Sequence, residues 1–375
     1  MTKIYISDCE ILSSQGDLSQ TINAIKDKEV KISSKQISTD IQVIDAPYFL
    51  FEDEIKDEKD EIYKAIRGIA AKILSKLSPQ ERLSTALILG TAIVDLNIAR
   101  AIEESVYEEQ KTEYNSHKYS IDSYVKEIAD EFGLNGFTMS INTACTSSAN
   151  ALLEGANLIN SGIFEKVLVI GAEIYSDMMS SGFSAMNLLS LKTQKPFDNN
   201  RDGLILGEGL AAVLLTKERS PWELMGGFSN CNSINITSVS EEGVEYVEVM
   251  DKALLSADVT TKDITALKTH ATSTPASDLS EINAIQAVFE KDIAMSVLKP
   301  YIGHTIGACG ALELAIFLSC IDEGFLPSTL ECEDAMVEEY TPLLTHQACK
   351  QGIFMLNYFG FGGNNTSIIV KKEAL

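Results

Sequence analysis

Short apolar runs in the middle of the chain carry its clearest structural signal. Residues 86–92 (ALILGTA), 137–142 (FTMSIN) and 167–171 (VLVIG) consist mostly of aliphatic and small side chains. Runs of this length and composition predict strands that are buried on both faces of a sheet. Segments with helical spacing separate them, so we expect an α/β fold with a mostly parallel or mixed central sheet.

The first part of the chain has a weaker pattern. Residues 4–6 predict a short strand, and a charged stretch follows at residues 51–64. Because this stretch carries charges of both signs, we interpret it as a solvated helix face or loop rather than an interaction tail. Apolar residues recur at helical spacing over residues 65–77, which predicts a helix. The polar segment 107–124 predicts a surface excursion.

The second half of the chain repeats the pattern of the first. Residues 266–272 match 86–92 as a strand followed by small residues, and the turn and helix start at 303–313 match those at 143–154. The matching segments lie about 160 to 180 residues apart, a spacing far too long for a solenoid. The pattern therefore predicts an internal duplication of one α/β unit.

A duplication of this kind divides the chain of 375 residues near its middle. We expect an N-terminal half of residues 1–218 and a C-terminal half of residues 219–375, joined near residues 217–223. Residues from opposite halves can then meet at one site.

Composition narrows the class of protein and its partners. A hydrophobic content of 45% and a charged content of 22% exclude a disordered chain. The net charge of −24 repels phosphate backbones and anionic lipids, so we expect neither nucleic acid nor a membrane as a partner. The N-terminus lacks a signal-peptide core, and no apolar run approaches the roughly 20 residues of a membrane helix. These features predict a cytoplasmic protein.

Cys145 is the first candidate for chemistry. The seven cysteines form no CxxC pair, and no His stands at metal-ligand spacing from them, so we expect no structural metal. Cys145 lies in NTACTSSANALL, at the expected turn from strand to helix. The positive field of a helix N-terminus favours the thiolate and makes the sulfur nucleophilic. The alternative is a small core residue.

Two histidines stand in similar surroundings in the second half of the chain. His270 lies in THATSTP and His304 lies in GHTIGACG, each followed by small residues. A hydrogen-bonded structural role is the alternative for each histidine taken alone. Together with Cys145 in a duplicated frame, they predict a catalytic Cys-His-His site.

Two pairs of charged residues near the histidines each allow two interpretations. Lys299 and Glu313 flank His304 and are either a buried pair that tunes this histidine or an ordinary surface salt bridge. Asp278 and Glu281 either orient His270 and the peptide after it or are acidic residues in the first turn of a helix.

A glycine-rich segment lies near the end of the chain, in NYFGFGGNN. Gly360 and Gly362 flank Phe361 and allow close backbone approach. The segment is either an exposed turn or an oxyanion hole with Phe361 as a movable lid. The loop KPFDNNRDG at residues 195–203 is interpreted as structural.

These motifs, taken in order, resemble those of the elongating β-ketoacyl-[acyl-carrier-protein] synthases. The resemblance rests on TACTSS, KPFDNNRDGLILGEG, HATSTPASD, KPYIGHTIGACGALE and NYFGFGGNN, and it runs from about residue 86 to residue 370. It implies a thiolase-like fold, in which two duplicated α/β halves form an αβαβα layered sandwich. It also implies an acyltransferase that acts in fatty-acid or specialised polyketide or polyene biosynthesis.

The resemblance assigns roles to individual residues. Cys145 matches the nucleophile that takes the acyl chain from a phosphopantetheine thioester. His270 and His304 match the pair that assists decarboxylation of the malonyl thioester, and the enolate then attacks the acyl group in a Claisen condensation. Lys299 and Glu313 match the charged pair behind the second histidine.

The remaining roles concern the oxyanion hole, the tunnel and the substrate. The backbone N–H groups of Cys145 and Phe361 match the oxyanion hole, and Phe361 matches the gatekeeper of the acyl tunnel with Phe183 near its partner wall. Thr272 and Thr274 match substrate-binding positions. The resemblance implies no metal and no cofactor beyond the phosphopantetheine of acyl carrier protein.

The chain departs from the family pattern at several positions. Ala271 replaces a usual Gly, Pro300 a common Ser, Asn364 a Thr and Asn187 an Arg that docks the acidic carrier protein. We therefore expect docking on a local basic patch around Lys64 and Arg67 or on a partner subunit. These departures resemble aryl-polyene or type II polyketide ketosynthases, which act as homodimers or as heterodimers with a chain-length subunit.

Three other functions compete with this hypothesis. A catalytically silent chain-length factor has the same fold but usually lacks the cysteine that Cys145 provides. A thiolase or initiating synthase that uses coenzyme A tends to carry Asn in place of His304. A Cys-His hydrolase is the third, and the chain has no protease-type cysteine motif.

Overall fold

The computed structural model describes residues 2–38, 43–56, 59–93, 121–232, 240–290 and 293–373. Its strands are β1 (Ile4–Ser13), β2 (Gly16–Asp17), β3 (Ser33–Ser38), β4 (Val43–Tyr48), β5 (Thr85–Thr91), β6 (Thr138–Ile141), β7 (Lys166–Glu173), β8 (Gly209–Thr216), β9 (Trp222–Cys231), β10 (Ile264–Lys268), β11 (Ala294–Ser296), β12 (Phe325–Leu326), β13 (Gln347–Ala348), β14 (Gly352–Phe359) and β15 (Asn364–Lys372). Its α-helices are α1 (Leu18–Asp27), α2 (Lys59–Leu74), α3 (Pro79–Leu83), α6 (Asp122–Phe132), α7 (Ser147–Asn160), α8 (Asp177–Ala185), α9 (Val244–Ser256), α10 (Pro275–Val288), α11 (Lys299–Ile302) and α12 (Cys309–Asp322). Short 3₁₀ turns are η1 (Thr261–Asp263), η2 (Ile306–Ala308) and η3 (Glu338–Tyr340).

Most strands belong to one mixed sheet. Its order within the described residues is β11-β10-β14-β15-β9-β1-β8-β7-β5-β6. Strand β5 runs parallel to β6 and β7, and β7 runs antiparallel to β8. Strand β10 likewise runs parallel to β11 and β14, and β14 runs antiparallel to β15. The two ends of the sheet therefore follow the same order and directions, as expected for two copies of one α/β unit.

The two copies meet where β1 lies between β8 and β9. Strand β1 pairs along nearly its whole length with β8, but with β9 it pairs only over Ile4–Ile6. The sequence-based boundary between residues 218 and 219 lies between β8 and β9 and stays a prediction.

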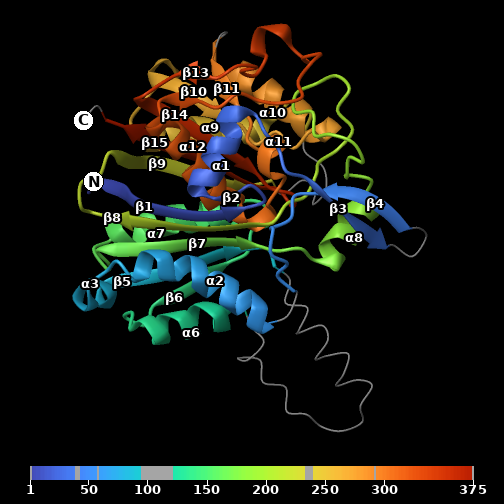
Figure 1. The fold of residues 1–375 in the computed structure, drawn as a ribbon. Helices are drawn as coiled ribbons and strands as arrows, with labels where there is room; N and C mark the ends of the chain where they lie inside the picture. Colours follow the sequence, from blue (N-terminus) through green and yellow to red (C-terminus); the bar gives the residue numbers. More distant parts are fainter. Residues whose placement is uncertain are drawn as a thin grey trace.

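Helices cover both faces of the sheet in layers (Figure 1). The buried apolar residues of α2 and α6 form one cluster with β5, β7 and β8, and those of α9 and α10 form another with β10, β14 and β15. The buried residues of helices α7 and α12 belong to a third cluster, which also contains residues of strands from both ends of the sheet. The starts of α7 and α12 thus meet in the middle of the molecule.

The sequence predicted most of these elements but misjudged one strand. The expected strands at 86–92 and 167–171 are β5 and β7, which are buried along their whole length. Of the expected strand 137–142, residues Thr138–Ile141 form β6, and all four are half-buried because β6 is the edge strand of the sheet. The prediction that it is buried on both faces is therefore wrong. Of the expected excursion 107–124, residues 107–120 lie outside the described residues.

Candidate active site

Cys145 lies at the corner between β6 and α7, as the sequence predicts. Ala144 before it has a left-handed backbone with φ 52°, which turns the chain sharply into the helix. The Ser147 hydroxyl holds this corner, because it accepts from the Thr143 N–H at 2.9 Å and donates to the Ala144 carbonyl at 2.7 Å. Cys145 is 3% exposed, so the corner presents the sulfur to the interior.

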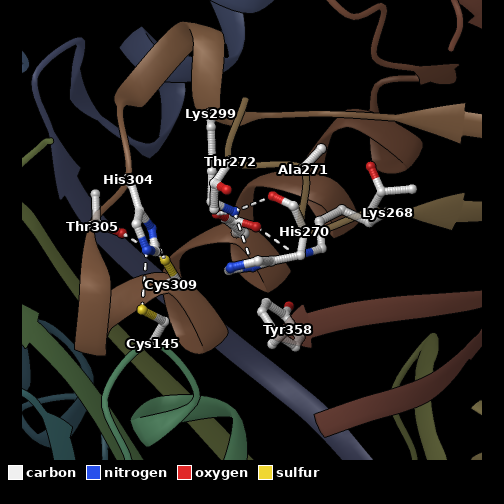
Figure 2. A network of polar contacts seen from close by, with 12 residues as sticks. Cys145, Lys268, His270, Ala271, Thr272, Lys299, His304, Thr305, Cys309 and Tyr358 are labelled. Carbon is white, nitrogen blue, oxygen red and sulfur yellow. Dashed lines mark hydrogen bonds and ion pairs between the residues drawn. The ribbon is translucent and has the colours of Figure 1, made fainter. Parts of the chain in front are cut away.

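His304 comes from the other half of the chain and contacts this sulfur. Its Nε2 lies 3.1 Å from the Cys145 Sγ, and its Nδ1 lies 3.2 Å from the Cys309 Sγ (Figure 2). The His304 N–H donates to the Ile205 carbonyl at 2.7 Å, and the His304 carbonyl accepts from the Gly207 N–H at 3.1 Å. The segment after residue 195 thus holds the histidine in place, in agreement with its structural interpretation.

His270 follows β10 and lies beside His304. The two imidazole rings are edge to face with centroids 5.4 Å apart. Burial lowers the pKa of His270 well below its usual value, and the nearby Lys299 lowers it further. Burial and Lys299 also lower the pKa of His304, to about 3. Both rings are therefore neutral near pH 7.

A buried carboxylate between two lysines lies behind the histidines. Glu313 accepts from the Lys299 Nζ at 2.8 Å and from the Lys268 Nζ at 2.6 Å, and all three side chains are fully buried. Lys299 also donates to the His270 carbonyl at 2.6 Å. Despite burial, the two ammonium groups lower the pKa of Glu313 to about 2. The buried alternative for Lys299 and Glu313 is confirmed, and the surface salt bridge is wrong.

The two acidic residues of α10 hold the backbone around His270. Glu281 accepts from the N–H of His270 at 2.7 Å and from that of Ala271 at 2.6 Å. Asp278 accepts from the N–H of Ser273 at 2.9 Å and from that of Phe197 at 2.8 Å. Glu281 therefore positions the peptide of His270, whereas Asp278 joins the next loop residues to Phe197.

The glycine-rich segment is the turn between β14 and β15. Gly362 and Gly363 have φ of 94° and 90°, a conformation that side chains rarely adopt. The turn also includes Gly360, whose N–H donates to the Asn364 carbonyl at 2.6 Å. Phe361 lies against Phe183 of α8, with ring centroids 6.3 Å apart. The predicted gate residues are thus in contact.

A cavity of about 240 Å³ connects these groups. Its walls include the Cys145 sulfur, both histidines, the two gate phenylalanines, Gly360, Thr272 and Thr274. The Thr272 and Thr274 hydroxyls lie 3.0 Å apart on one wall. The predicted nucleophile, both histidines, the two phenylalanines, Gly360 and the two threonines therefore line one cavity, whereas Gly362 does not.

The expectation that the helix field makes Cys145 a thiolate is wrong for the resting protein. Burial raises the pKa of its thiol to about 11. Hydrogen bonds from the backbone N–H groups of Phe361 and Cys145 and the charge of Lys299 oppose this effect without reversing it. Removal from water is therefore the largest effect on this thiol, which has to lose its proton during the reaction.

Two family models cover most of the chain. Residues 70–220 match the beta-ketoacyl synthase N-terminal domain, and residues 223–333 match the beta-ketoacyl synthase C-terminal domain. The chain belongs to the β-ketoacyl synthase family.

Curated relatives in this family are 3-oxoacyl-[acyl-carrier-protein] synthases. The chain is 31% identical to synthase 2 of Vibrio harveyi over 263 residues, which are 64% of this chain and 63% of the relative. It is 32% identical to synthase 2 of Rhizobium meliloti over 267 residues, 66% of this chain and 63% of the relative. The match thus spans less than two thirds of these relatives.

Solved structures show that the fold extends over the whole chain. A ketosynthase from Xenorhabdus doucetiae, solved in complex with its chain length factor, has a TM-score of 0.86 at 24% identity and covers 99% of this chain and 98% of its own. A beta-ketoacyl synthase from Burkholderia phymatum has a TM-score of 0.85 at 22% identity and covers 100% of both chains. The predicted thiolase-like α/β fold is therefore confirmed.

At two positions that depart from the β-ketoacyl synthase pattern, the backbone has a positive φ. Ala271 has a φ of 34°, at a position where the family usually has Gly, and the Glu281 carboxylate holds its N–H. Asn187 has a φ of 55°, which Asn tolerates better than most residues.

The expected basic patch is neutralised by acidic neighbours. Arg67 donates to Glu131 through its Nε at 2.8 Å and through a second guanidinium nitrogen. Lys64 pairs with Glu61 at 2.6 Å. These ion pairs offset the charge of Lys64 and Arg67, and docking of the carrier protein on this patch or on a partner subunit stays a prediction.

Sequence reasoning missed several residues of this β-ketoacyl synthase site. Lys268 gave no signal, because its position two residues before His270 does not reveal that it turns inward towards Glu313. Cys309 lies five residues after His304 in the quoted GHTIGACG motif, and nothing in that motif shows that its sulfur faces the histidine. Tyr246 reaches the cavity from α9 and stacks on Phe359 at 3.8 Å. Within the described residues, no group of three or more His, Cys, Asp or Glu could hold a metal ion.

Proposed function

We propose that the protein is a β-ketoacyl synthase that joins an acyl chain on Cys145 to a malonyl unit carried by acyl carrier protein. The observation that supports this most directly is the contact between the Cys145 sulfur and His304 at 3.1 Å, with His270 beside it at the same cavity. A nucleophile and two imidazoles from opposite halves of the chain are the groups that such a condensation requires.

In the first step, Cys145 takes the acyl chain from the phosphopantetheine thioester. The Cys145 sulfur gives up its proton and attacks the acyl carbonyl. The bond from this carbonyl to the pantetheine sulfur breaks, pantetheine leaves as a thiolate, and the thiolate takes up a proton in place of the one that Cys145 lost. The oxyanion of the tetrahedral intermediate accepts from the N–H groups of Cys145 and Phe361, the same groups that lower the pKa of the resting thiol.

In the second step, the malonyl thioester loses its carboxylate as carbon dioxide. The electron pair of the broken bond forms an enolate, whose oxygen accepts hydrogen bonds from His270 and His304. The enolate carbon then attacks the acyl–Cys145 carbonyl, a carbon–carbon bond forms, and the Cys145 thiolate leaves. Neutral imidazoles suit this role, since they donate an N–H without carrying a charge.

The same proposal covers cofactors, partners and location. The reaction needs no metal or redox cofactor, because the phosphopantetheine of acyl carrier protein delivers both substrates.

The edge strand β6 and an open groove of about 910 Å³ beside it, lined by Met139, Ile141 and Phe228, suit a second subunit of the same fold. That subunit is either a second copy or a chain-length partner. No helix in the described part of the chain is long and apolar enough to span a membrane, and we propose a cytoplasmic enzyme.

We propose specialised polyketide or polyene synthesis rather than housekeeping fatty-acid synthesis. The support is the set of departures at Ala271, Pro300, Asn364 and Asn187, together with the paired Arg67. The acyl groups that co-purify with the protein, identified by mass spectrometry, test this assignment, and saturated fatty acyl chains alone contradict it.

Intact-protein mass spectrometry tests the nucleophile. After incubation with an acyl-loaded carrier protein, the wild type should gain one acyl mass, and Cys145→Ala should gain none. Cys231→Ala is the matched control, because Cys231 is exposed and remote from the cavity, and it should be acylated like the wild type. A wild type that never gains the acyl mass contradicts the proposal and favours a silent chain-length subunit.

Release of carbon dioxide from malonyl carrier protein tests the histidine pair. His304→Ala should reduce this release by about 100-fold, the usual effect of removing one donor to a developing oxyanion. Unchanged release in His304→Ala removes His304 from the mechanism.

A further inference from the structure

The proposed condensation leaves one buried sulfur without a role. Cys309 begins α12, is fully buried and has its Sγ 3.2 Å from the His304 Nδ1, whereas Cys145 contacts the other ring nitrogen, Nε2 (Figure 2). No other hydrogen bond to this Nδ1 is found among the residues that the structure describes. The contact of Cys309 with His304 therefore affects which ring nitrogen carries the proton.

A neutral imidazole carries one proton, on either Nδ1 or Nε2. The two tautomers differ in function at this site. With the proton on Nε2, His304 donates towards Cys145 and towards a substrate oxygen placed there. With the proton on Nδ1, the Nε2 atom is an acceptor and cannot stabilise a developing enolate oxygen.

The surroundings of the Cys309 sulfur favour the first tautomer. The Thr305 hydroxyl donates to the Cys309 Sγ at 3.6 Å, so the sulfur already accepts one hydrogen bond. The S–H proton needs an acceptor in this buried place, and the His304 Nδ1 is the nearest one. Burial also raises the pKa of Cys309 above its usual value, with a further rise from Glu313, so the thiol keeps its proton.

We propose that Cys309 is a positioning residue that donates its S–H to the His304 Nδ1 and so keeps the proton of the ring on Nε2. Thr305, Cys309 and His304 then form a chain of donors that ends at the Cys145 sulfur. This inference rests on the proposed function for its catalytic consequence, but the tautomer itself is a property of the resting protein.

Nitrogen-15 NMR of histidine-labelled protein tests the tautomer without reference to activity. The wild type should show an unprotonated Nδ1 and a protonated Nε2 for His304, whose signals are assigned by their absence in His304→Asn. Cys309→Ala should show a mixture of the two forms, and Cys309→Ser, which keeps a hydroxyl donor, should resemble the wild type. A wild-type proton on Nδ1 overturns the proposal.

The two half-reactions supply a second test. Cys309→Ala should lower carbon dioxide release from malonyl carrier protein by about tenfold, the order expected for the loss of one neutral hydrogen bond. Acylation of Cys145, followed by mass, should change less than twofold, and Cys309→Ser should restore decarboxylation. A purely packing role would lower both steps and the thermal midpoint together, and that result overturns the proposal.

The two proposals fail in distinguishable ways. If the wild type is neither acylated nor releases carbon dioxide, the proposed function fails, while the NMR result still decides the tautomer. If the wild type is active and Cys309→Ala decarboxylates at the wild-type rate, the role of Cys309 fails and the proposed function stands.

Discussion

At the scale of single residues, the charge of the site depends on three buried side chains. Lys268 and Lys299 share one carboxylate, Glu313, so the group as a whole carries one positive charge in the interior. Lys268 also donates to the Asn357 carbonyl at 2.7 Å and lies 3.6 Å from the centroid of the Tyr358 ring. These contacts replace the water that an ammonium group otherwise needs.

The loss of Glu313 should therefore cost more stability than the loss of Lys268. Glu313→Gln leaves two buried ammonium groups without a counter-charge, whereas Lys268→Met leaves a neutral Lys299–Glu313 pair. Removing one partner of a buried pair costs roughly 3 to 5 kcal/mol, and we expect Glu313→Gln to reach this range and Lys268→Met to stay below it. Urea denaturation at pH 7 measures both values.

An exposed lysine serves as the control for this comparison. Lys252 pairs with Glu248 on the surface of α9, where its side chain is 46% exposed. Lys252→Met should change the unfolding free energy by less than about 1 kcal/mol. Equal losses of unfolding free energy in Lys268→Met and Glu313→Gln would contradict this argument from the charges of Lys268, Lys299 and Glu313.

Glu173 at the end of β7 is a second buried acid with an effect on stability. Its Oε2 accepts from the N–H groups of Gly307 at 2.9 Å and Ala92 at 3.3 Å, and its Oε1 has no partner among the described residues. Burial raises the pKa of Glu173 to about 8 in the folded protein. The unfolded chain loses this proton near pH 4.5, so folding should become less favourable as the pH rises from 4.5 to about 8.

Glu173→Gln should remove this pH dependence. The variant has no proton to lose, so its unfolding free energy relative to the wild type should increase steadily between pH 5 and pH 8. Denaturation curves at several pH values measure the difference. A difference that is constant over this range would mean that Glu173 is ionised in the folded protein.

At the scale of helices, two backbones come close together behind the site. Helix α7 starts after Cys145 and α12 starts after His304, and the Ala311 N–H donates to the Ser148 hydroxyl at 3.0 Å. A Cβ atom at Gly310 would lie 2.0 Å from the Ala149 nitrogen. The absence of a side chain at Gly310 therefore allows the two helix starts to approach each other. This approach also brings the Cys145 sulfur close to the His304 imidazole.

Gly310→Ala should separate these helix starts. The added methyl group meets rigid backbone, so we expect a loss of about 1 to 3 kcal/mol in unfolding free energy and a large loss of condensation activity. Gly68→Ala is the control, because a Cβ at Gly68 on the exposed face of α2 meets no described atom within 4 Å. That substitution should gain up to about 1 kcal/mol through helix propensity. Activity retained in a stable Gly310→Ala protein would contradict the argument.

At the scale of the whole molecule, the net charge of −24 bears on carrier-protein docking. Arg67 and Lys64 are paired with carboxylates, so they add little attraction for an acidic carrier. Like charges repel over a distance of about 10 Å at 0.1 M salt, and added salt weakens the repulsion.

The KM for an acyl carrier protein substrate should therefore fall as the ionic strength rises from about 10 to about 150 mM. A neutral pantetheine thioester of the same acyl group is the control, and its KM should not change. Steady-state kinetics with both substrates make the comparison. A KM for the carrier substrate that rises with salt would indicate a basic docking surface on this chain or on its partner subunit.

The sequence also determined much of the architecture. Apolar runs identified β5 and β7, because a strand buried on both faces has to be apolar at every position. The match between residues 86–92 and 266–272 predicted that β5 and β10 play equivalent parts in the sheet. Strand β6 was misjudged because its apolar run does not reveal that it is the edge strand.

Local motifs likewise identified Cys145, His270 and His304, since each lies where small residues allow a sharp turn or a close approach. The tertiary structure alone decided whether these groups carry a proton and which side chains contact them. Burial makes Cys145 a thiol despite its helix end, because desolvation depends on every element that covers the sulfur. Lys268 joins Glu313 of α12 from the end of β10, and Cys309 is directed at His304 by the start of α12. Contacts between distant segments and removal from water are properties of packing, which a linear sequence does not display.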